Sequence, residues 1–152
     1  MNAARARPKR PNSLPRAAGR MPTNRRVTMP VLDMTFGIGD LVRLRSAVAA
    51  YAAELGAGGR AADVVLIAHE LASNAIRHGG GGRLRLWRDD CRLLCRVTDT
   101  GPGLADVAGS GAELPSAQVP GGRGLWIARR LAAVRIDSGP KGTVITAAVP
   151  LP

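Results

Sequence analysis

Aromatic residues are scarce in this sequence, at 3% of its 152 residues, although hydrophobic residues of all kinds make up 45%. The core of its fold must therefore be aliphatic. No apolar run approaches the roughly 18 residues that a membrane-spanning helix needs, and no apolar segment follows the basic N-terminus as in a signal peptide. We expect a cytoplasmic protein with one folded domain and no membrane association.

Cysteine is almost absent, with only Cys91 and Cys95 present. They lie four residues apart in a segment that alternates like a strand, which puts them about 13 Å apart at the usual rise per residue. That distance is too long for a disulfide, so we expect two reduced thiols, as is usual in the cytosol.

Acidic residues are missing from residues 1–30, which carry eight basic residues and five prolines. The net charge of +11 therefore falls mainly on this segment, and the remainder carries only +3. We predict that residues 1–27 form a disordered basic arm and that residues 28–152 form the folded domain. Such an arm can bind nucleic acid, but it has no aromatic residues to stack on bases, so a solvated extension is the preferred interpretation.

Several common catalytic motifs are also absent. No GxxxxGK[ST] phosphate loop and no GxSxG nucleophile turn occurs. His69 and Glu70 begin like HExxH, but Ser73 stands where the second histidine of a zinc protease belongs. The glycines around Pro102 follow a strand-like segment but lack the third glycine of a dinucleotide-binding turn.

Hydrophobic spacing predicts two helices in the first half of the chain. The first begins at Leu41 and ends near Leu55, and we expect the Asp40 carboxylate to accept hydrogen bonds from its first-turn amides. The second carries Asp63 in its first turn, where a negative charge suits the helix dipole, and ends at His78 before four glycines.

Alternating segments predict a sheet. The expected strands are 27–36, 83–88, 91–98, 134–137 and 143–149, with a third helix at 124–133. Residues 105–120 are rich in Gly, Pro, Ser and Ala without a period, and we expect them to form a mobile lid. The order predicts an α+β fold, a two-layer α/β sandwich in which a mixed, mostly antiparallel sheet carries its helices on one face.

The second helix carries one line of polar residues. Glu70, Asn74 and either Arg77 or His78 fall at offsets 0, +4 and +7 or +8, so they share a helical face. The Glu70 carboxylate can act as a base, and the Asn74 amide oxygen suits Mg²⁺, which usually keeps several waters and phosphate oxygens. Arg77 or His78 could meet phosphate charge. Alone, such a line is more often a solvated helix face.

Two glycine-rich stretches follow this helix. Asp99 can accept a hydrogen bond from an exocyclic amine such as that of adenine, while Gly101 and Gly103 let the backbone pass close to a flat base. Gly122 and Gly124 leave the amides of a helix start free to hold phosphates. Each stretch alone is usually a turn or a loop, but the three motifs in this order are more specific.

The three motifs together resemble a known superfamily. ExxxN at Glu70–Asn74, DxGxG at Asp99–Gly103 and GxGL at Gly122–Leu125 resemble the N, G1 and G2 boxes of the GHKL ATPases, over about residues 30–150. The small size, the NAIRHG sequence and Lys141–Thr143 are most similar to the anti-sigma-factor serine/threonine kinases. No histidine-bearing dimerisation helix or transducer domain accompanies these motifs, so we expect neither an autophosphorylating histidine kinase nor a gyrase-type machine.

The resemblance implies the GHKL fold and a site for ATP and Mg²⁺. It implies that the nucleotide contacts Asn74, Arg77, His78, Asp99, Gly101, Gly103, Gly122, Gly124, Leu125 and Thr143. Asn74 would hold the Mg²⁺ that bridges the ATP phosphates, and Thr143 would support the adenine, partly through water. Glu70 would be the catalytic general base that orients a serine hydroxyl of a partner protein.

The resemblance also implies a function. The protein would phosphorylate an anti-sigma-factor antagonist and sequester a sigma factor, and relatives commonly form homodimers. The segment before Gly121 lacks the helical character of a full lid, which leaves open an ATP-binding regulatory module without kinase activity. Nucleic-acid binding through the basic arm remains a further alternative.

Overall fold

The computed structural model describes residues 31–116 and 122–152. The elements in chain order are β1 (Leu32–Gly37), α1 (Leu41–Glu54), the 3-10 helix η1 (Gly58–Arg60), α2 (Ala61–Gly79), β2 (Gly81–Asp89), β3 (Arg92–Asp99), α3 (Arg123–Leu131), β4 (Ala133–Gly139) and β5 (Gly142–Pro150). Apart from η1, this is the predicted order. The predicted basic arm, the start of the predicted first strand and residues 117–120 of the predicted lid lie outside the described residues.

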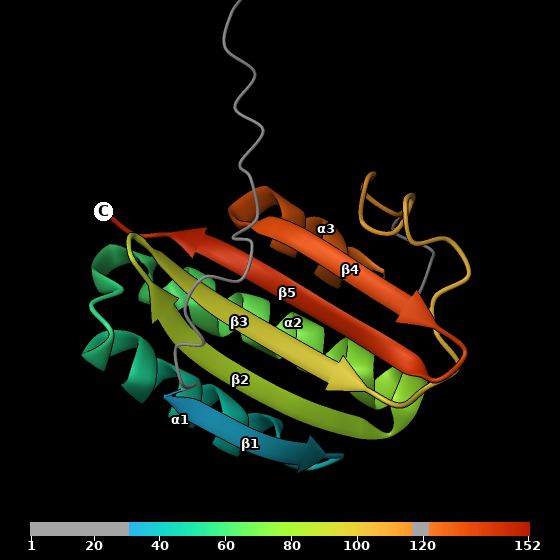
Figure 1. The fold of residues 1–152 in the computed structure, drawn as a ribbon, viewed down its shortest axis with the longest axis horizontal. Helices are drawn as coiled ribbons and strands as arrows, with labels where there is room; N and C mark the ends of the chain where they lie inside the picture. Colours follow the sequence, from blue (N-terminus) through green and yellow to red (C-terminus); the bar gives the residue numbers. More distant parts are fainter. Residues whose placement is uncertain (1–30, 117–121) are drawn as a thin grey trace, which may run out of the picture.

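The strands form one five-stranded sheet in the order β1-β2-β3-β5-β4. Its four pairings are all antiparallel, so the described sheet is antiparallel throughout and contains no parallel pair. The three α-helices lie together behind the sheet in Figure 1, with α2 behind its middle, α1 beside β1 and β2, and α3 beside β4. The predicted two-layer α+β sandwich is confirmed.

The core lies between α2 and the centre of the sheet. Fully buried side chains of α2 recur at helical spacing, as in Val64, Ile67 and Leu71. They face alternate residues of the central strands, including Leu86 and Leu93. This aliphatic packing fixes α2 in the middle of the molecule, so its remaining polar line has a defined position relative to the ends of the strands. Among the described residues, no helix is long and apolar enough to cross a bilayer.

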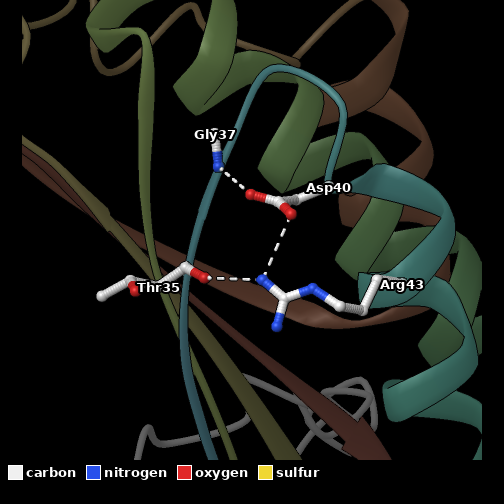
Figure 2. Close-up of polar contacts among 4 residues, drawn as sticks. All are labelled: Thr35, Gly37, Asp40 and Arg43. Atoms are coloured by element: carbon white, nitrogen blue, oxygen red, sulfur yellow. Dashed lines mark hydrogen bonds and ion pairs between the residues drawn. The ribbon is translucent and has the colours of Figure 1, made fainter.

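The expected capping role of Asp40 is wrong. Asp40 occupies the N-cap position of α1, but its backbone is helical (φ −93°, ψ −4°) and its side chain makes no capping hydrogen bond. Instead, its Oδ2 accepts a hydrogen bond from the Gly37 amide at 2.8 Å, and its Oδ1 pairs with Arg43 at 3.2 Å. Arg43 also approaches the Thr35 carbonyl (Figure 2). A helical backbone at Asp40 turns the carboxylate back over the β1–α1 turn, so it closes the turn and leaves the first-turn amides uncapped.

The described part of the predicted lid, residues 105–116, contains turns and no helix or strand. Asp106 accepts a hydrogen bond from the Gly109 amide at 2.9 Å, which closes one turn. Arg129 of α3 then donates from Nε to the Ser110 carbonyl at 2.9 Å. The segment is therefore attached to α3, beside which it lies in Figure 1.

Candidate functional site

The polar line on α2 is formed by one continuous helix, as the spacing predicts. Glu70 and Asn74 are half-buried, whereas Arg77 and His78 in the last turn are exposed. Within residues 31–116 and 122–152, neither the Glu70 carboxylate nor the Asn74 amide has a hydrogen-bond or ion-pair partner. Two half-buried polar groups without a partner in the described part of the chain are suited to bind a ligand.

The first glycine-rich turn lies against the C-terminal end of α2. A Cβ placed on Gly101 would lie 2.5 Å from the His78 carbonyl oxygen. A Cβ placed on Gly79 would lie 3.1 Å from the Gly101 amide nitrogen and 3.2 Å from the Asp99 Cβ. The contact therefore requires glycine at position 101 and is tight at position 79, and it brings Asp99 directly beside the last turn of α2.

Asp99 is the buried carboxylate of the site, with 7% of its surface exposed. Its Oδ1 accepts a hydrogen bond from the Gly101 amide at 2.9 Å, which fixes the carboxylate within the turn. Its Oδ2 has no hydrogen-bond partner among the described residues. Because a carboxylate only accepts hydrogen bonds, this free oxygen is suited to an amino group such as that of adenine.

The second glycine-rich turn lies against the other end of the polar line. A Cβ placed on Gly124 would lie 2.8 Å from Glu70 Oε2 and 3.2 Å from Glu70 Cβ. Gly122 stands at the N-cap of α3 with φ +82° and makes no side-chain cap, so the first amides of α3 have no side-chain partner among the described residues. A helix start with free amides beside a carboxylate and an amide is suited to phosphate that carries a metal ion.

Together these contacts place both glycine turns on one helix. Gly124 packs at Glu70, and Gly101 packs at His78, eight residues further along α2. At 1.5 Å per residue these contacts are about 12 Å apart along the helix axis, with Asn74 midway between them. The structure therefore brings together Glu70, Asn74, Asp99 and the two turns, which the sequence separates by more than fifty residues.

Thr143 lies in the strand next to Asp99. The two residues are cross-strand partners of β3 and β5, and Thr143 is 3% exposed. Sequence reasoning missed Ser138, the partner of Thr143 in β4. The Ser138 and Thr143 hydroxyl oxygens lie 2.8 Å apart, and the Leu104 amide donates to Ser138 Oγ at 2.8 Å. A signal for Ser138 was present in the sequence. Only two residues separate Gly139 from Gly142, which is typical of a tight hairpin, and the register of that hairpin pairs Ser138 with Thr143.

Gly103 joins this hairpin to the first glycine turn. Its backbone is left-handed, with φ +88°, and a Cβ there would lie 2.4 Å from the Gly139 carbonyl oxygen. The position thus requires glycine both for its conformation and for its close contact with β4. This contact holds the turn after Asp99 against the β4–β5 hairpin.

Three residues that were predicted to contact the nucleotide lie in surroundings unlike those of Glu70, Asn74 and Asp99. Leu125 is 8% exposed and belongs to the hydrophobic core, and a Cβ on Gly111 would lie 2.6 Å from Leu125 Cβ. Leu125 therefore packs α3 into the hydrophobic core and against the residue 105–116 segment. The side chains of Arg77 and His78 are exposed in the last turn of α2, and no hydrogen bond or ion pair joins them to another described residue.

The donor set fits Mg²⁺ only when the nucleotide supplies most ligands. Among the described residues there is no group of three or more His, Cys, Asp or Glu side chains that could hold a metal ion. Asn74 and Glu70 offer two half-buried oxygen-bearing groups that have no partner within residues 31–116 and 122–152. Mg²⁺ is typically held by one or two protein oxygens together with substrate phosphates and water, so these residues suit it in that form.

Comparison with known proteins agrees with this geometry. Residues 38–149 match the family model of the histidine kinase-like ATPase domain. No curated protein sequence matches the chain.

Solved structures give the same fold. The histidine kinase domain of the Erythrobacter litoralis EL346 blue-light activated histidine kinase is 22% identical, with a TM-score of 0.52 over 77% of this chain and 68% of that one. A mycobacterial sensor histidine kinase, MprB, is 16% identical, with a TM-score of 0.50 over 79% of this chain and 98% of that one. At these identities the likeness shows the fold alone. With more than half of its length matched by the family model, the chain belongs to the histidine kinase-like ATPase domain family.

Proposed function

We propose that the protein binds Mg·ATP and is a protein serine/threonine kinase of the anti-sigma-factor type. The observation that supports this best is the packing of both glycine turns on α2, at Glu70 and at His78, with Asn74 between them. A carboxylate that can meet the base at one end of a helix and a helix start that can meet the phosphates at the other are what an extended nucleotide needs. The family of ATPase domains supports ATP as that nucleotide.

In this proposal each group has one task. The free Oδ2 of Asp99 accepts from the adenine amine, and the uncapped amides of α3 after Gly122 hold the phosphates. Asn74 contributes an oxygen to Mg²⁺, which neutralises phosphate charge during transfer. Glu70 orients a serine hydroxyl of the substrate protein and accepts its proton.

The transfer itself needs few protein groups. A bond forms between the serine oxygen and the γ-phosphorus, the bond from that phosphorus to the β,γ-bridging oxygen breaks, and ADP leaves. Positioning and charge neutralisation supply most of the acceleration in such reactions, so one carboxylate, one amide and a row of backbone amides suffice.

The regulatory part of the proposal concerns two protein partners. An antagonist protein is the substrate, and a sigma factor is the protein that the kinase sequesters. Phosphorylation adds a charge of roughly −1.5 to −2 to the antagonist at neutral pH, which changes its affinity for the kinase surface. The sigma factor then binds in its place. Capture from native lysate with and without ATP, followed by identification of the bound proteins, tests this competition.

A kinase assay with Mg²⁺, ATP and the captured antagonist tests the catalytic role. Glu70→Gln should lower the transfer rate by roughly 10²- to 10⁴-fold, the usual contribution of a general base, while ATP binding remains. Glu54→Gln, an exposed carboxylate at the end of α1, is the matched control and should transfer at the wild-type rate. Transfer at full rate by the Glu70 variant would falsify its role.

A second candidate is an ATP-binding regulatory module without kinase activity. The observation in its favour is the turn-only conformation of residues 105–116, which contain no helix to cover the nucleotide. This candidate predicts that calorimetry registers ATP binding while no captured protein becomes phosphorylated. Stoichiometric phosphate on a serine of the antagonist excludes it.

A further inference from the structure

Three polar residues form one row across the helix-facing side of the sheet. Asp99 of β3 pairs with Thr143 of β5, and Thr143 pairs in turn with Ser138 of β4. Asp99 and Thr143 are almost fully buried, with 7% and 3% of their surfaces exposed. The row lies beside the turn formed by Gly101 and Gly103, where the proposed function puts the base.

Either hydroxyl can donate in the Ser138–Thr143 hydrogen bond, and the groups on either side of the pair favour one direction. Ser138 Oγ already accepts from the Leu104 amide at 2.8 Å, and it lies 2.8 Å from Thr143 Oγ1. On its other side Thr143 faces Asp99, whose carboxylate can only accept. The favourable arrangement therefore has Ser138 donating to Thr143, so that the Thr143 proton turns toward the side of Asp99 and the base.

We propose that Ser138 is a positioning residue that holds Thr143 as a hydrogen-bond donor and thereby makes the site select adenine over 6-oxopurines. The proposal rests on the proposed nucleotide site. Adenine presents a donor at its amine and an acceptor at N1, which match the acceptor Asp99 and the donor Thr143. Hypoxanthine and guanine present the reverse pattern, a carbonyl oxygen at C6 and a proton on N1, and mismatch both residues.

Without the Ser138 hydroxyl, Thr143 is free to rotate. It can then donate to N1 of adenine or accept from the N1 proton of hypoxanthine, directly or through one water. Discrimination at N1 falls although Asp99 is unchanged. One neutral hydrogen bond sets the scale, so we expect the ratio of ATP affinity to ITP affinity to fall about fivefold in Ser138→Ala.

The test measures dissociation constants for ATP and ITP, both with Mg²⁺, by calorimetry on the full chain. Ser138→Ala should lower the ATP-to-ITP ratio about fivefold, and Ser138→Thr, which keeps a hydroxyl, should retain the wild-type ratio. Thr143→Val removes the donor itself and keeps the Leu104–Ser138 bond. The double variant Ser138→Ala/Thr143→Val should therefore show the same ratio as Thr143→Val alone, because Ser138 acts through Thr143.

The outcomes separate this inference from a structural role and from the proposed function. An unchanged ratio in Ser138→Ala, or effects of the two substitutions that simply add, overturns the inference while ATP binding stands. A wild-type chain that binds no ATP overturns the proposed function and the inference with it. If Ser138→Ala does not fold, the comparison of Thr143→Ser with Thr143→Val decides instead. Thr143→Ser should keep the wild-type ratio of ATP affinity to ITP affinity, and loss of this ratio in both variants overturns the inference.

Discussion

Gly124 lies so close to Glu70 that a Cβ at position 124 would be 2.8 Å from Glu70 Oε2. The nearest atom is the end of a flexible side chain, so Gly124→Ala displaces the carboxylate more readily than it disturbs the fold. Alanine also gains about 1 kcal/mol over glycine as a helix former. We expect a melting temperature close to that of the wild type but a transfer rate lowered at least tenfold, since about 1 Å of misplacement can cost about 100-fold.

Measuring both quantities on the same preparation separates geometry from folding. The control is Gly59→Ala, because a Cβ at Gly59 meets nothing within 4 Å and its φ lies outside the left-handed region. That variant should keep both the melting temperature and the transfer rate. If Gly124→Ala transfers phosphate at the wild-type rate, then the contact between α3 and the Glu70 carboxylate does not position that carboxylate for transfer.

The other glycine contact with α2 is rigid, and its substitution should affect stability. A Cβ at Gly101 would lie 2.5 Å from the His78 carbonyl oxygen, a backbone atom that cannot rotate away. We expect Gly101→Ala to lower the free energy of unfolding by about 1–3 kcal/mol, the usual range for overpacking. Denaturant unfolding with Gly59→Ala as the reference checks this, and equal midpoints for the two variants would count against the packing at His78.

The sequence predicted α2 and its polar line well because both depend on local periodicity. Buried side chains such as Ile67 and Leu71 recur at helical spacing, and Glu70 and Asn74 share the adjoining face by geometry alone. The hairpins were predicted for a similar reason, since alternation and short turns fix their register. The order of the motifs along the chain then indicated the family without any knowledge of their contacts.

Contacts between distant segments could not be predicted in this way. Asp40 has a capping residue's position and type, but the free Gly37 amide and Arg43 compete for its carboxylate. Arg60 lies in η1 between α1 and α2, yet its side chain bonds to the end of α3, seventy-one residues away. Such partners depend on how the elements pack, and no local pattern encodes them.

Arg60 fastens the end of α3 to the start of α2. Its Nη2 donates to the Leu131 carbonyl at 2.7 Å, and its Nη1 pairs with Asp63 at 2.8 Å. Its Nε is buried without a partner among the described residues, which offsets part of the gain. Arg60→Met should therefore destabilise the fold by about 1 kcal/mol in denaturant unfolding. Arg45→Met, an exposed arginine of α1, is the control and should change little.

The two cysteines should differ sharply in reactivity. Cys91 is exposed at the β2–β3 turn, whereas Cys95 is fully buried, and burial raises the pKa of its thiol to about 12. Because the thiolate is the reactive form, a thiol reagent at about pH 8 should modify one cysteine per native chain. Cys91→Ser should abolish this labelling, Cys95→Ser should leave it, and denaturant should expose both thiols. Two equivalents from the native chain would contradict the burial of Cys95.

Asp40 should make the fold sensitive to acid. The hydrogen bond from the Gly37 amide, together with Arg43, lowers the pKa of Asp40 below its usual 3.8. The charged form of Asp40 therefore stabilises the fold at pH values above about 3.8, and this contribution is lost as the pH falls through the lowered pKa of the folded state. The difference in unfolding free energy between wild type and Asp40→Asn should stay constant from about pH 7 to pH 5 and shrink below about pH 3.8. Ser46→Ala, an exposed and non-titrating change in α1, should show no such pH dependence, and a difference that grows on acidification would reverse the sign assigned to Asp40.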